Sequence, residues 1–435
     1  MAVCVFFGLK NTPLGPVAAV AHTKLNILHR LVGYTTVFLV ILHAVFYTVH
    51  FGRQSRWATL IEEGNLEGLV AGALMLILLM GIFRHRSYEV FYVSHIVGFV
   101  AVVTLTGLHR PDWAKKLPIL MLCIACMWTV DRVIRAARTL YNLVNNQATF
   151  YPLPGGGTRL VLKKPGPKVA LPGSHGFLWI PRIHLYQSHP FSIVNNGPLG
   201  LELIIKPHGG FTKAVSNLAA QHPGSAQWAS MDGPYGLLPD TRVYDKLILV
   251  SGGSGAAFTF GLMNRTLNSK EGDKPQSIDF AWAVKRTEHL SWFYEHLKTL
   301  TKTEQDVNLK LYVTSEGASA SPGAATRTTI APAQVQSSIE SLPLRKQATF
   351  DYKTITEVDD STSRVLDEQA ANIKFGKMDA RTVILEAMQG VGKDQRVLFA
   401  ACGPKALMDA VRDSADHYRI EPGYRIDVHC EDFGS

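Results

Sequence analysis

The chain has 435 residues, of which 47% are hydrophobic, and a formal net charge of +9. This length allows two or three domains. The charge is modest for the size, and the basic residues form no stripe interleaved with aromatic side chains, so no nucleic-acid partner is expected. The five cysteines are scattered along the chain, which argues against a disulfide framework.

The hydrophobic residues are concentrated near the N-terminus. An apolar segment at the start of residues 1–24 is too short to span a bilayer, and four longer apolar runs follow it. These runs predict a helical transmembrane domain at residues 25–141: Leu25–Val49, Leu66–Phe83, Tyr88–Leu108 and Leu117–Tyr141. Lys and Arg are more frequent on the side of the membrane where the segment after the last run lies. By the positive-inside rule, that segment is cytosolic.

Four histidines recur at matching positions in these runs. His29 and His43 lie on the first run, and His95 and His109 lie on the third. The two histidines of each run are fourteen residues apart. In a helix this spacing keeps both on one face, about 21 Å apart along the axis. Histidine in lipid is costly and usually marks a functional site with a partner. Two adjacent helices would match His29 with His95 and His43 with His109, which suits bis-imidazole ligation of haem. The alternative is four packing or helix-end histidines.

The sequence around these histidines resembles the ferric reductase family, which includes the NADPH oxidases. The similarity lies in Leu28-His29-Arg30-Leu31-Val32-Gly33 and in Phe91-Tyr92-Val93-Ser94-His95 with His109. The resemblance implies two b-type haems (haem b) stacked across the membrane, held by the four histidines. It also implies further spans before this sequence, so residues 1–24 are expected to be the end of a preceding span and its loop.

Residues 146–241 contain short β-prone runs separated by Pro and Gly, a pattern typical of a small antiparallel barrel. His189-Pro190-Phe191-Ser192 resembles the family's flavin-binding motif. Gly209-Gly210-Phe211-Thr212 follows a strand that ends at Lys206, and a helix starting near Thr212 would favour a pyrophosphate. Each motif alone is also compatible with a simple turn. The resemblance implies that both motifs bind FAD, together with Lys206.

Residues 242–435 begin with a pattern typical of a dinucleotide-binding domain. A strand at Lys246–Val250 leads into a loop with Gly252-Gly253-Ser254-Gly255 and then a helix, although the spacing is not GxGxxG. The next strand, Ile278–Val284, ends in Lys285-Arg286. These cations would hold a 2′-phosphate and favour NADPH, unless they are only a solvated charge pair.

The C-terminal part contains an insertion and two further candidate sites. Residues 314–379 are expected to contain a low-complexity insertion, because much of this stretch is rich in Ser, Ala, Thr and Pro. Cys402-Gly403-Pro404 follows the strand Arg396–Ala400. The resemblance places this motif where the nicotinamide meets the flavin, and it implies that Phe433 is an aromatic beside the flavin ring. Cys402 and Phe433 are therefore the candidate catalytic residues.

The sequence thus predicts a multi-domain protein. An α-helical transmembrane haem-binding bundle precedes an antiparallel β-barrel FAD-binding domain and an α/β, Rossmann-like NADPH-binding domain of the ferredoxin-reductase type. The expected function is electron transfer from cytosolic NADPH through FAD and two haems to an extracytoplasmic ferric or cupric chelate, in support of metal uptake. We expect an integral protein of the plasma membrane, in contact with lipid, and the sequence allows a homo-oligomer. The alternatives are an NADPH oxidase that makes superoxide and a non-catalytic haem membrane protein. The short loops Phe51–Asn65 and Arg110–Lys116 favour the reductase.

Overall fold

The computed structural model describes residues 1–12, 14, 22–79, 88–110, 115–166, 169–270, 275–315, 373–420 and 423–431. The chain divides into two compact units, Met1–Tyr141 and Asn142–Ser435. The candidate residue Phe433 and most of the insertion expected at 314–379 lie outside the described residues.

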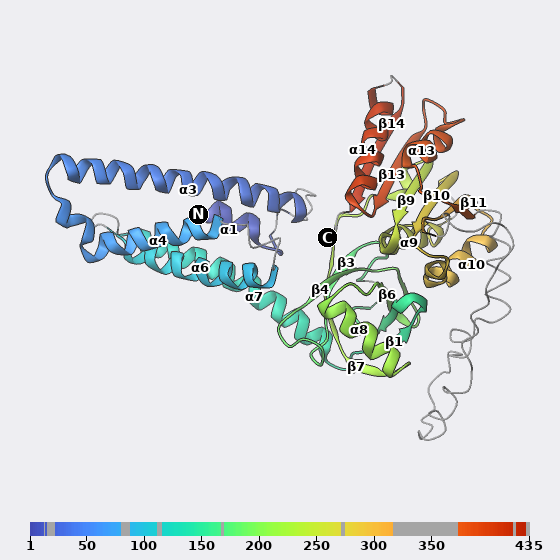
Figure 1. Cartoon of the computed structure of the whole chain (residues 1–435), viewed down its shortest axis with the longest axis horizontal. Helices are drawn as coiled ribbons and strands as arrows, with labels where there is room; N and C mark the ends of the chain where they lie inside the picture. The colour runs from blue at the N-terminus through green and yellow to red at the C-terminus, as the bar shows by residue number, and fades with distance from the viewer. Residues whose placement is uncertain are drawn as a thin grey trace. The chain divides into compact units, whose positions relative to one another are not determined.

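The first unit is helical. Its described residues include the short helix α1 (Ala2–Gly8) and four long helices that run side by side (Figure 1). The long helices are α3 (His22–Arg53), α4 (Glu63–Leu79), α6 (Tyr88–Leu108) and α7 (Leu117–Leu143), and the 3-10 helix η1 (Trp57–Ile61) follows α3. Among the described residues, α3, α6 and α7 are long and apolar enough to cross a membrane. The described part of α4 has 17 residues.

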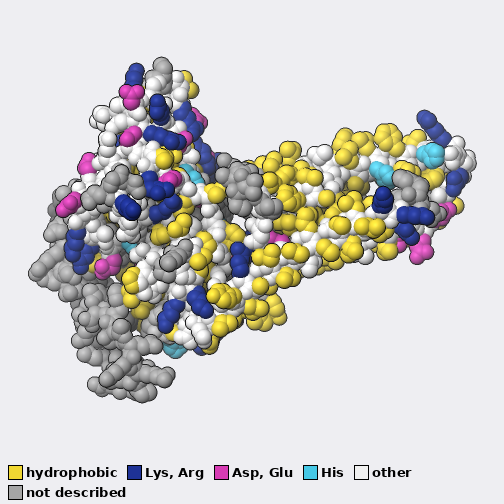
Figure 2. Space-filling view, turned by 180° about the vertical axis from the view of Figure 1, so that it is seen from behind, with side chains coloured by type: hydrophobic (Ala, Val, Ile, Leu, Met, Phe, Trp, Pro, Cys, Tyr) yellow, Lys and Arg dark blue, Asp and Glu magenta, His cyan; other side chains and the backbone are white. Residues whose placement is uncertain are grey.

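Apolar side chains cover the outside of this helical unit. Phe46, Leu69 and Val97 are each more than 60% exposed, and Figure 2 shows hydrophobic side chains over much of the unit on the face in view. The buried contacts between helices are narrow, with Val37, Met75 and Val102 in one small cluster. A helix bundle with a small interior and an apolar exterior is suited to lipid, where apolar faces need no cover.

The second unit begins with an antiparallel β domain. Its five-stranded sheet has the order β5-β6-β2-β1-β7 and its three-stranded sheet the order β4-β3-β8. The strands are β1 (Gln147–Pro152), β2 (Thr158–Leu162), β3 (His175–Trp179), β4 (His189–Ser192), β5 (Asn195–Gly197), β6 (Gly200–Ile205), β7 (Ala226–Trp228) and β8 (Ser230–Tyr235). Both sheets contribute to one apolar core, and helix α8 (Gly210–Gln221) adds Phe211 and Val215 to it.

A parallel sheet with the order β12-β11-β10-β9-β13-β14 forms the rest of the unit. Its strands are β9 (Lys246–Gly252), β10 (Ser277–Val284), β11 (Asp306–Val313), β12 (Ile373–Phe375), β13 (Arg396–Cys402) and β14 (Arg425–Glu431). Helices α9 (Ala256–Leu267) and α10 (Tyr294–Lys302) pack in one core cluster, and α13 (Ala380–Met388) and α14 (Lys405–Ile420) in the other. The runs Leu247–Val250 and Leu398–Ala401 are buried throughout, as expected for parallel strands covered on both faces. β12 lies within the region predicted as an insertion.

The strand order of this sheet reverses between β9 and β13. From β9 the chain moves through β10 and β11 towards one edge, whereas β13 lies on the other side of β9. In such open sheets, ligands bind outside the carboxyl ends of the strands at this reversal. The fold therefore places a ligand site where β9 and β13 end.

A buried ion pair links the antiparallel domain to the parallel one. Arg159 on β2 and His296 on α10 contact the two carboxylate oxygens of Glu202 on β6, at 2.5 and 3.3 Å. Burial alone would raise the pKa of Glu202, but the hydrogen bond and charge of His296, together with the Arg159 guanidinium, lower this pKa to about 2. The folded state therefore stabilises the ionised carboxylate.

We predict that this carboxylate makes stability depend on pH. Because its pKa is lower in the folded than in the unfolded state, its contribution is present above about pH 4.5 and is lost as the pH falls towards 2. At neutral pH, Glu202→Gln should lower the free energy of unfolding by roughly 3 kcal/mol. Denaturant unfolding of the purified protein at several pH values measures the difference from wild type, which should shrink below pH 4.5.

The matched control is Asp240→Asn. Asp240 also has a pKa lowered to about 2, mainly by its hydrogen bond from Arg242, but this pair is about half exposed. An exposed pair contributes at most about 1 kcal/mol. Equal effects of the two substitutions would contradict the role assigned to the buried pair.

Candidate functional site

The structure brings the four predicted histidines together as two pairs. His29 and His43 lie on α3, His95 lies on α6, and His109 directly follows α6. The ring centres of His29 and His95 are 6.2 Å apart, and those of His43 and His109 are also 6.2 Å apart. The ring planes meet at 67° and 81°. The fourteen-residue spacing thus produces two similar pairs along one pair of helices.

The dimensions of each pair suit a metal ion between the rings. Two imidazole nitrogens at about 2 Å from one metal put the ring centres about 6 Å apart. Among the described residues there is no group of three or more His, Cys, Asp or Glu side chains that could hold a metal ion. Two imidazoles alone suit a metal whose other ligands come from a macrocycle, as in bis-histidine haem.

Hydrogen bonds orient one histidine of each pair. His29 Nδ1 lies 2.8 Å from the carbonyl oxygen of Cys4 on α1. His109 Nδ1 lies 2.5 Å from the carbonyl oxygen of Gly64 on α4. A carbonyl only accepts, so Nδ1 carries the proton in both rings, and Nε2 keeps the lone pair that a metal needs.

The two predicted flavin motifs meet in the antiparallel domain. The ring of Phe211 stacks on His189 with centres 4.4 Å apart, and on Phe191 with centres 6.1 Å apart. Pro190 is exposed and Ser192 is buried on the same strand, β4. The stack joins β4 to the start of α8, although the two motifs are separate in sequence.

The start of α8 has the features of an anion site. The helix begins at Gly210, two residues before the predicted start, and Gly210 has a φ of 50°. The Thr212 hydroxyl accepts a hydrogen bond from the His208 amide and donates one to the Gly209 carbonyl. Backbone N–H groups at a helix N-terminus attract phosphate.

Two glycine loops interlock at the strand-order reversal. Gly252 ends β9, and Gly253–Gly255 form a 3-10 turn that contains Ser254. A Cβ added to Gly255 would lie 2.3 Å from the carbonyl oxygen of Cys402, and one added to Gly252 would lie 2.7 Å from Pro404 Cδ. Gly403 is also closely packed: a Cβ added to it would lie 3.0 Å from the backbone nitrogen of Gly252. The two predicted nucleotide motifs thus form one surface, with Cys402 buried beneath it.

The predicted cations separate into two environments. Lys206 follows β6, and its Nζ lies 4.0 Å from where a Cβ on Gly253 would be. Desolvation, and next the like charge of Lys285, lower the pKa of Lys206. Arg286 instead pairs with Glu288 at 2.8 Å. Lys206 therefore brings a positive charge to the glycine loop, and Lys285 adds a like charge that acts on Lys206, whereas Arg286 is already paired.

The last described strand returns to the antiparallel domain. His429 on β14 stacks on Phe258 with ring centres 5.6 Å apart, and its Nε2 lies 3.0 Å from Glu431 Oε1. A Cβ on Gly236 would lie 3.9 Å from the same Glu431 oxygen. The chain therefore comes back to the turn after β8 just before Phe433, which is outside the described residues.

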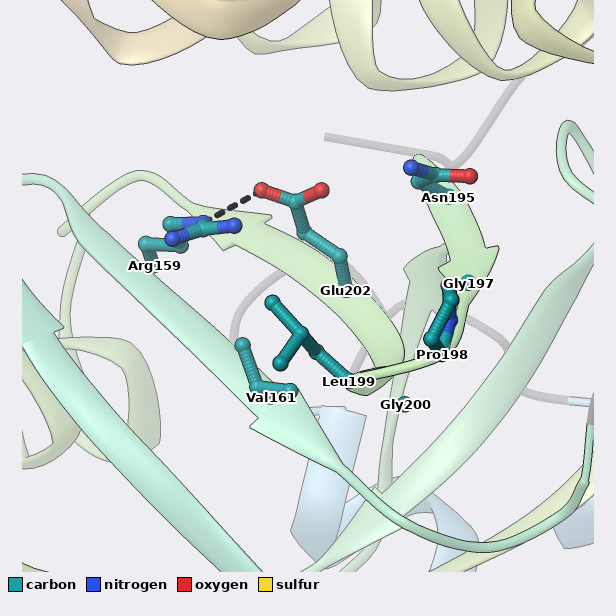
Figure 3. Close-up of a pocket in the computed structure, with 8 residues that line it drawn as sticks. All are labelled: Arg159, Val161, Asn195, Gly197, Pro198, Leu199, Gly200 and Glu202. Carbon is teal, nitrogen blue, oxygen red and sulfur yellow. Dashed lines mark hydrogen bonds and ion pairs between the residues drawn. The ribbon is translucent and has the colours of Figure 1, made fainter. Parts of the chain in front are cut away.

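A separate, open hollow lies beside the buried ion pair (Figure 3). It is lined by Arg159, Val161, Asn195, Gly197, Pro198, Leu199, Gly200 and Glu202. None of the predicted site residues lines this hollow.

The groups that orient the histidines were not predicted from the sequence. The acceptors are main-chain carbonyls, at Cys4 and Gly64, and a main-chain atom leaves no residue-type signal. The one available signal was a glycine four residues after each carbonyl, at Gly8 and Gly68.

Three family models match consecutive parts of the chain. A ferric reductase like transmembrane component matches residues 1–106, an FAD-binding domain matches 145–238, and a ferric reductase NAD binding domain matches 244–416. The predicted fold class is confirmed: a helical transmembrane region precedes FAD-binding and NAD-binding domains. The chain is therefore an integral membrane protein.

Fungal relatives match most of the chain. Ferric/cupric reductase transmembrane component 1 of Candida albicans is 24% identical over 438 residues, covering 98% of this chain and 54% of that protein. Ferric/cupric reductase transmembrane component 2 of Schizosaccharomyces pombe is 26% identical over 366 residues, covering 71% of this chain and 63% of that protein. The chain thus spans less than two-thirds of the length of these relatives.

Proposed function

We propose that this chain, which has the membrane, FAD-binding and NAD-binding domains of the ferric reductase family, is a transmembrane metalloreductase. It carries electrons from NADPH to a ferric or cupric chelate on the other side of the membrane. The names of the fungal relatives support this acceptor class. The observation that carries the proposal is the presence of two histidine pairs, each with ring centres 6.2 Å apart, on helices suited to a membrane.

The chain's own residues supply ligation, positioning and charge. His29 with His95, and His43 with His109, hold two b-type haems through Nε2. Phe191 would contact the FAD ring system or its chain, with the buried Phe211 ring stacked behind it, and the amides at the start of α8 would bind its pyrophosphate. When bound, FAD accepts a hydride from NADPH and releases electrons singly to the haems.

The nucleotide site lies at the carboxyl ends of β9 and β13. The amides of Gly252–Gly255 would bind the phosphates, because this glycine-rich turn joins the end of β9 to the start of α9, as in dinucleotide-binding sites. Gly403 and Pro404 would form the wall against which the nicotinamide binds, next to the buried Cys402. Lys206 neutralises a phosphate from the flavin side, and Lys285 holds the 2′-phosphate of NADPH.

The charge pattern supports an orientation with the nucleotide domains in the cytosol. His43 and His109 then belong to the outer haem, and His29 and His95 to the inner one. We propose the plasma membrane as the location, since an extracytoplasmic chelate is the acceptor. Metal uptake is the process that such a reduction would serve.

We predict that the two haems are lost separately. His43→Ala or His109→Ala should remove the outer haem and leave the inner one, because each pair has its own ligands. Reduced-minus-oxidised spectra of the membranes should then show about half of the b-type signal, and ferric-chelate reduction by NADPH should stop. Full haem content in both variants would refute the pairing. His50→Ala on the same helix is the control, because the contacts recorded for His50 are with Tyr47, Phe51 and Gln54.

We predict unequal roles for the two cations after β10. Lys285→Ala should raise the KM for NADPH about tenfold or more, since a charged hydrogen bond to phosphate contributes about 1.5–3 kcal/mol. Arg286→Ala should have a smaller effect, because its guanidinium pairs with Glu288. Steady-state kinetics with NADPH and NADH make the comparison. An equal rise in KM for both nucleotides in the Lys285 variant would exclude a 2′-phosphate contact.

A further inference from the structure

The two hydrogen-bonded histidines are held by the same local arrangement on two different helices. On α1, the Cys4 carbonyl lies 2.8 Å from His29 Nδ1, and Gly8 follows four residues later. On α4, the Gly64 carbonyl lies 2.5 Å from His109 Nδ1, and Gly68 follows four residues later. We call a carbonyl with a glycine four positions later a carbonyl–glycine motif.

The spacing of four has a physical reason. In a helix the carbonyl of residue i accepts from the amide of residue i+4 and has a second lone pair to offer. The Cα–Cβ bonds tilt towards the N-terminus, so the side chain at i+4 covers the surface over that carbonyl. A glycine at i+4 leaves the carbonyl open to a side chain from another helix.

The positions of the histidine rings agree with this reasoning. A Cβ on Gly68 would lie 2.6 Å from His109 Nδ1 and Cε1 and 2.7 Å from Nε2, so the ring occupies the space that any side chain would need. A Cβ on Gly8 would lie 3.1 Å from His29 Nδ1 and 3.3 Å from Cε1. Both rings therefore lie directly over a glycine, and the contact at Gly68 is the closer one.

Each histidine pair contains one ring fixed in this way and one that is not. His95 Nδ1 is buried without a hydrogen-bond partner among the described residues. His43 packs against the Tyr47 ring with centres 4.6 Å apart. The two fixed rings belong to different pairs, His29 to one and His109 to the other.

We propose that the two carbonyl–glycine motifs are positioning elements for the haem ligands. Each holds the proton of one imidazole on Nδ1 and turns its Nε2 towards the partner histidine. Cys4, Gly8, Gly64 and Gly68 contact no reacting atom and act only through His29 and His109. The inference rests on the proposed haem ligation and adds residues from α1 and α4, helices that carry no predicted ligand.

The test compares Gly68→Ala with Gly72→Ala on the same helix. A Cβ on Gly72 would meet only Val40 Cγ1, at an ordinary 3.7 Å. The purified full chain is mixed with excess apomyoglobin, a haem acceptor, and the retained haem is measured by its spectrum and redox titration. Loss of such an orienting hydrogen bond typically weakens a metal site 10–100-fold. Gly68→Ala should therefore release the haem of the His43–His109 pair about 10–100-fold more readily, whereas Gly72→Ala should behave as wild type.

Gly8→Ala supplies the reciprocal case. Its effect should be confined to the His29–His95 pair and should be smaller, because the contact at Gly8 is looser. The haem that survives in Gly68→Ala should have the midpoint potential of the one that survives in His43→Ala. Loss of both haems in both variants, or retention equal to that of Gly72→Ala, would overturn the inference. Absence of b-type haem from the wild-type protein would instead refute the proposed function.

Discussion

The arrangement of the helical unit depends on the cost of placing imidazoles among apolar side chains. A neutral imidazole has one donor and one acceptor, and lipid satisfies neither. The helices meet the donor part of this requirement for His29 and His109, whose Nδ1 atoms lie beside main-chain carbonyls. Each of these rings also faces a second histidine, with ring centres 6.2 Å apart. This requirement accounts for Gly8 and Gly68, over which the two hydrogen-bonded rings lie.

The second unit satisfies a similar requirement for phosphates. Its two candidate anion sites, at the start of α8 and after β9, are both formed by glycine and backbone amides. Lys206 connects them, because it follows β6 of the antiparallel domain and reaches the Gly253 loop. The buried Glu202 carboxylate, held by Arg159 and His296, fixes the two parts of this unit to each other. Flavin and nucleotide would thus be held at one junction.

The sequence predicted the features that depend on periodicity and local composition. The fourteen-residue spacing was enough to predict that His29 pairs with His95, because a helix has a fixed rise and rotation per residue, so equal spacings on two adjacent helices match. The Gly252–Gly255 loop followed from a strand, glycines and a helix in succession. β12, by contrast, has three residues inside a region of low-complexity composition, so no pattern could reveal it.

Other parts of the site depended on tertiary contacts that no local pattern contains. Lys285 and Arg286 are adjacent and alike in sequence, yet Glu288 pairs with Arg286, and Lys285 lies near Lys206. Every residue has a main-chain carbonyl. Those of Cys4 and Gly64 differ from the rest only because a histidine ring approaches them in the folded chain. A sequence therefore identifies ligand side chains more readily than the groups that orient them.

In the proposed function, electrons from NADPH cross the protein through its flavin and histidine sites to a metal chelate. The most direct measurement is NADPH-driven ferric-chelate reduction by membranes that contain the protein, with and without superoxide dismutase, for wild type and for Phe191→Ala with Ser192→Ala. We expect a wild-type rate that the dismutase does not change. The double variant should show no reduction by NADPH, although dithionite still reduces its haems. Reduction that the dismutase abolishes would identify dioxygen as the acceptor, and a normal rate in the double variant would contradict the electron path itself.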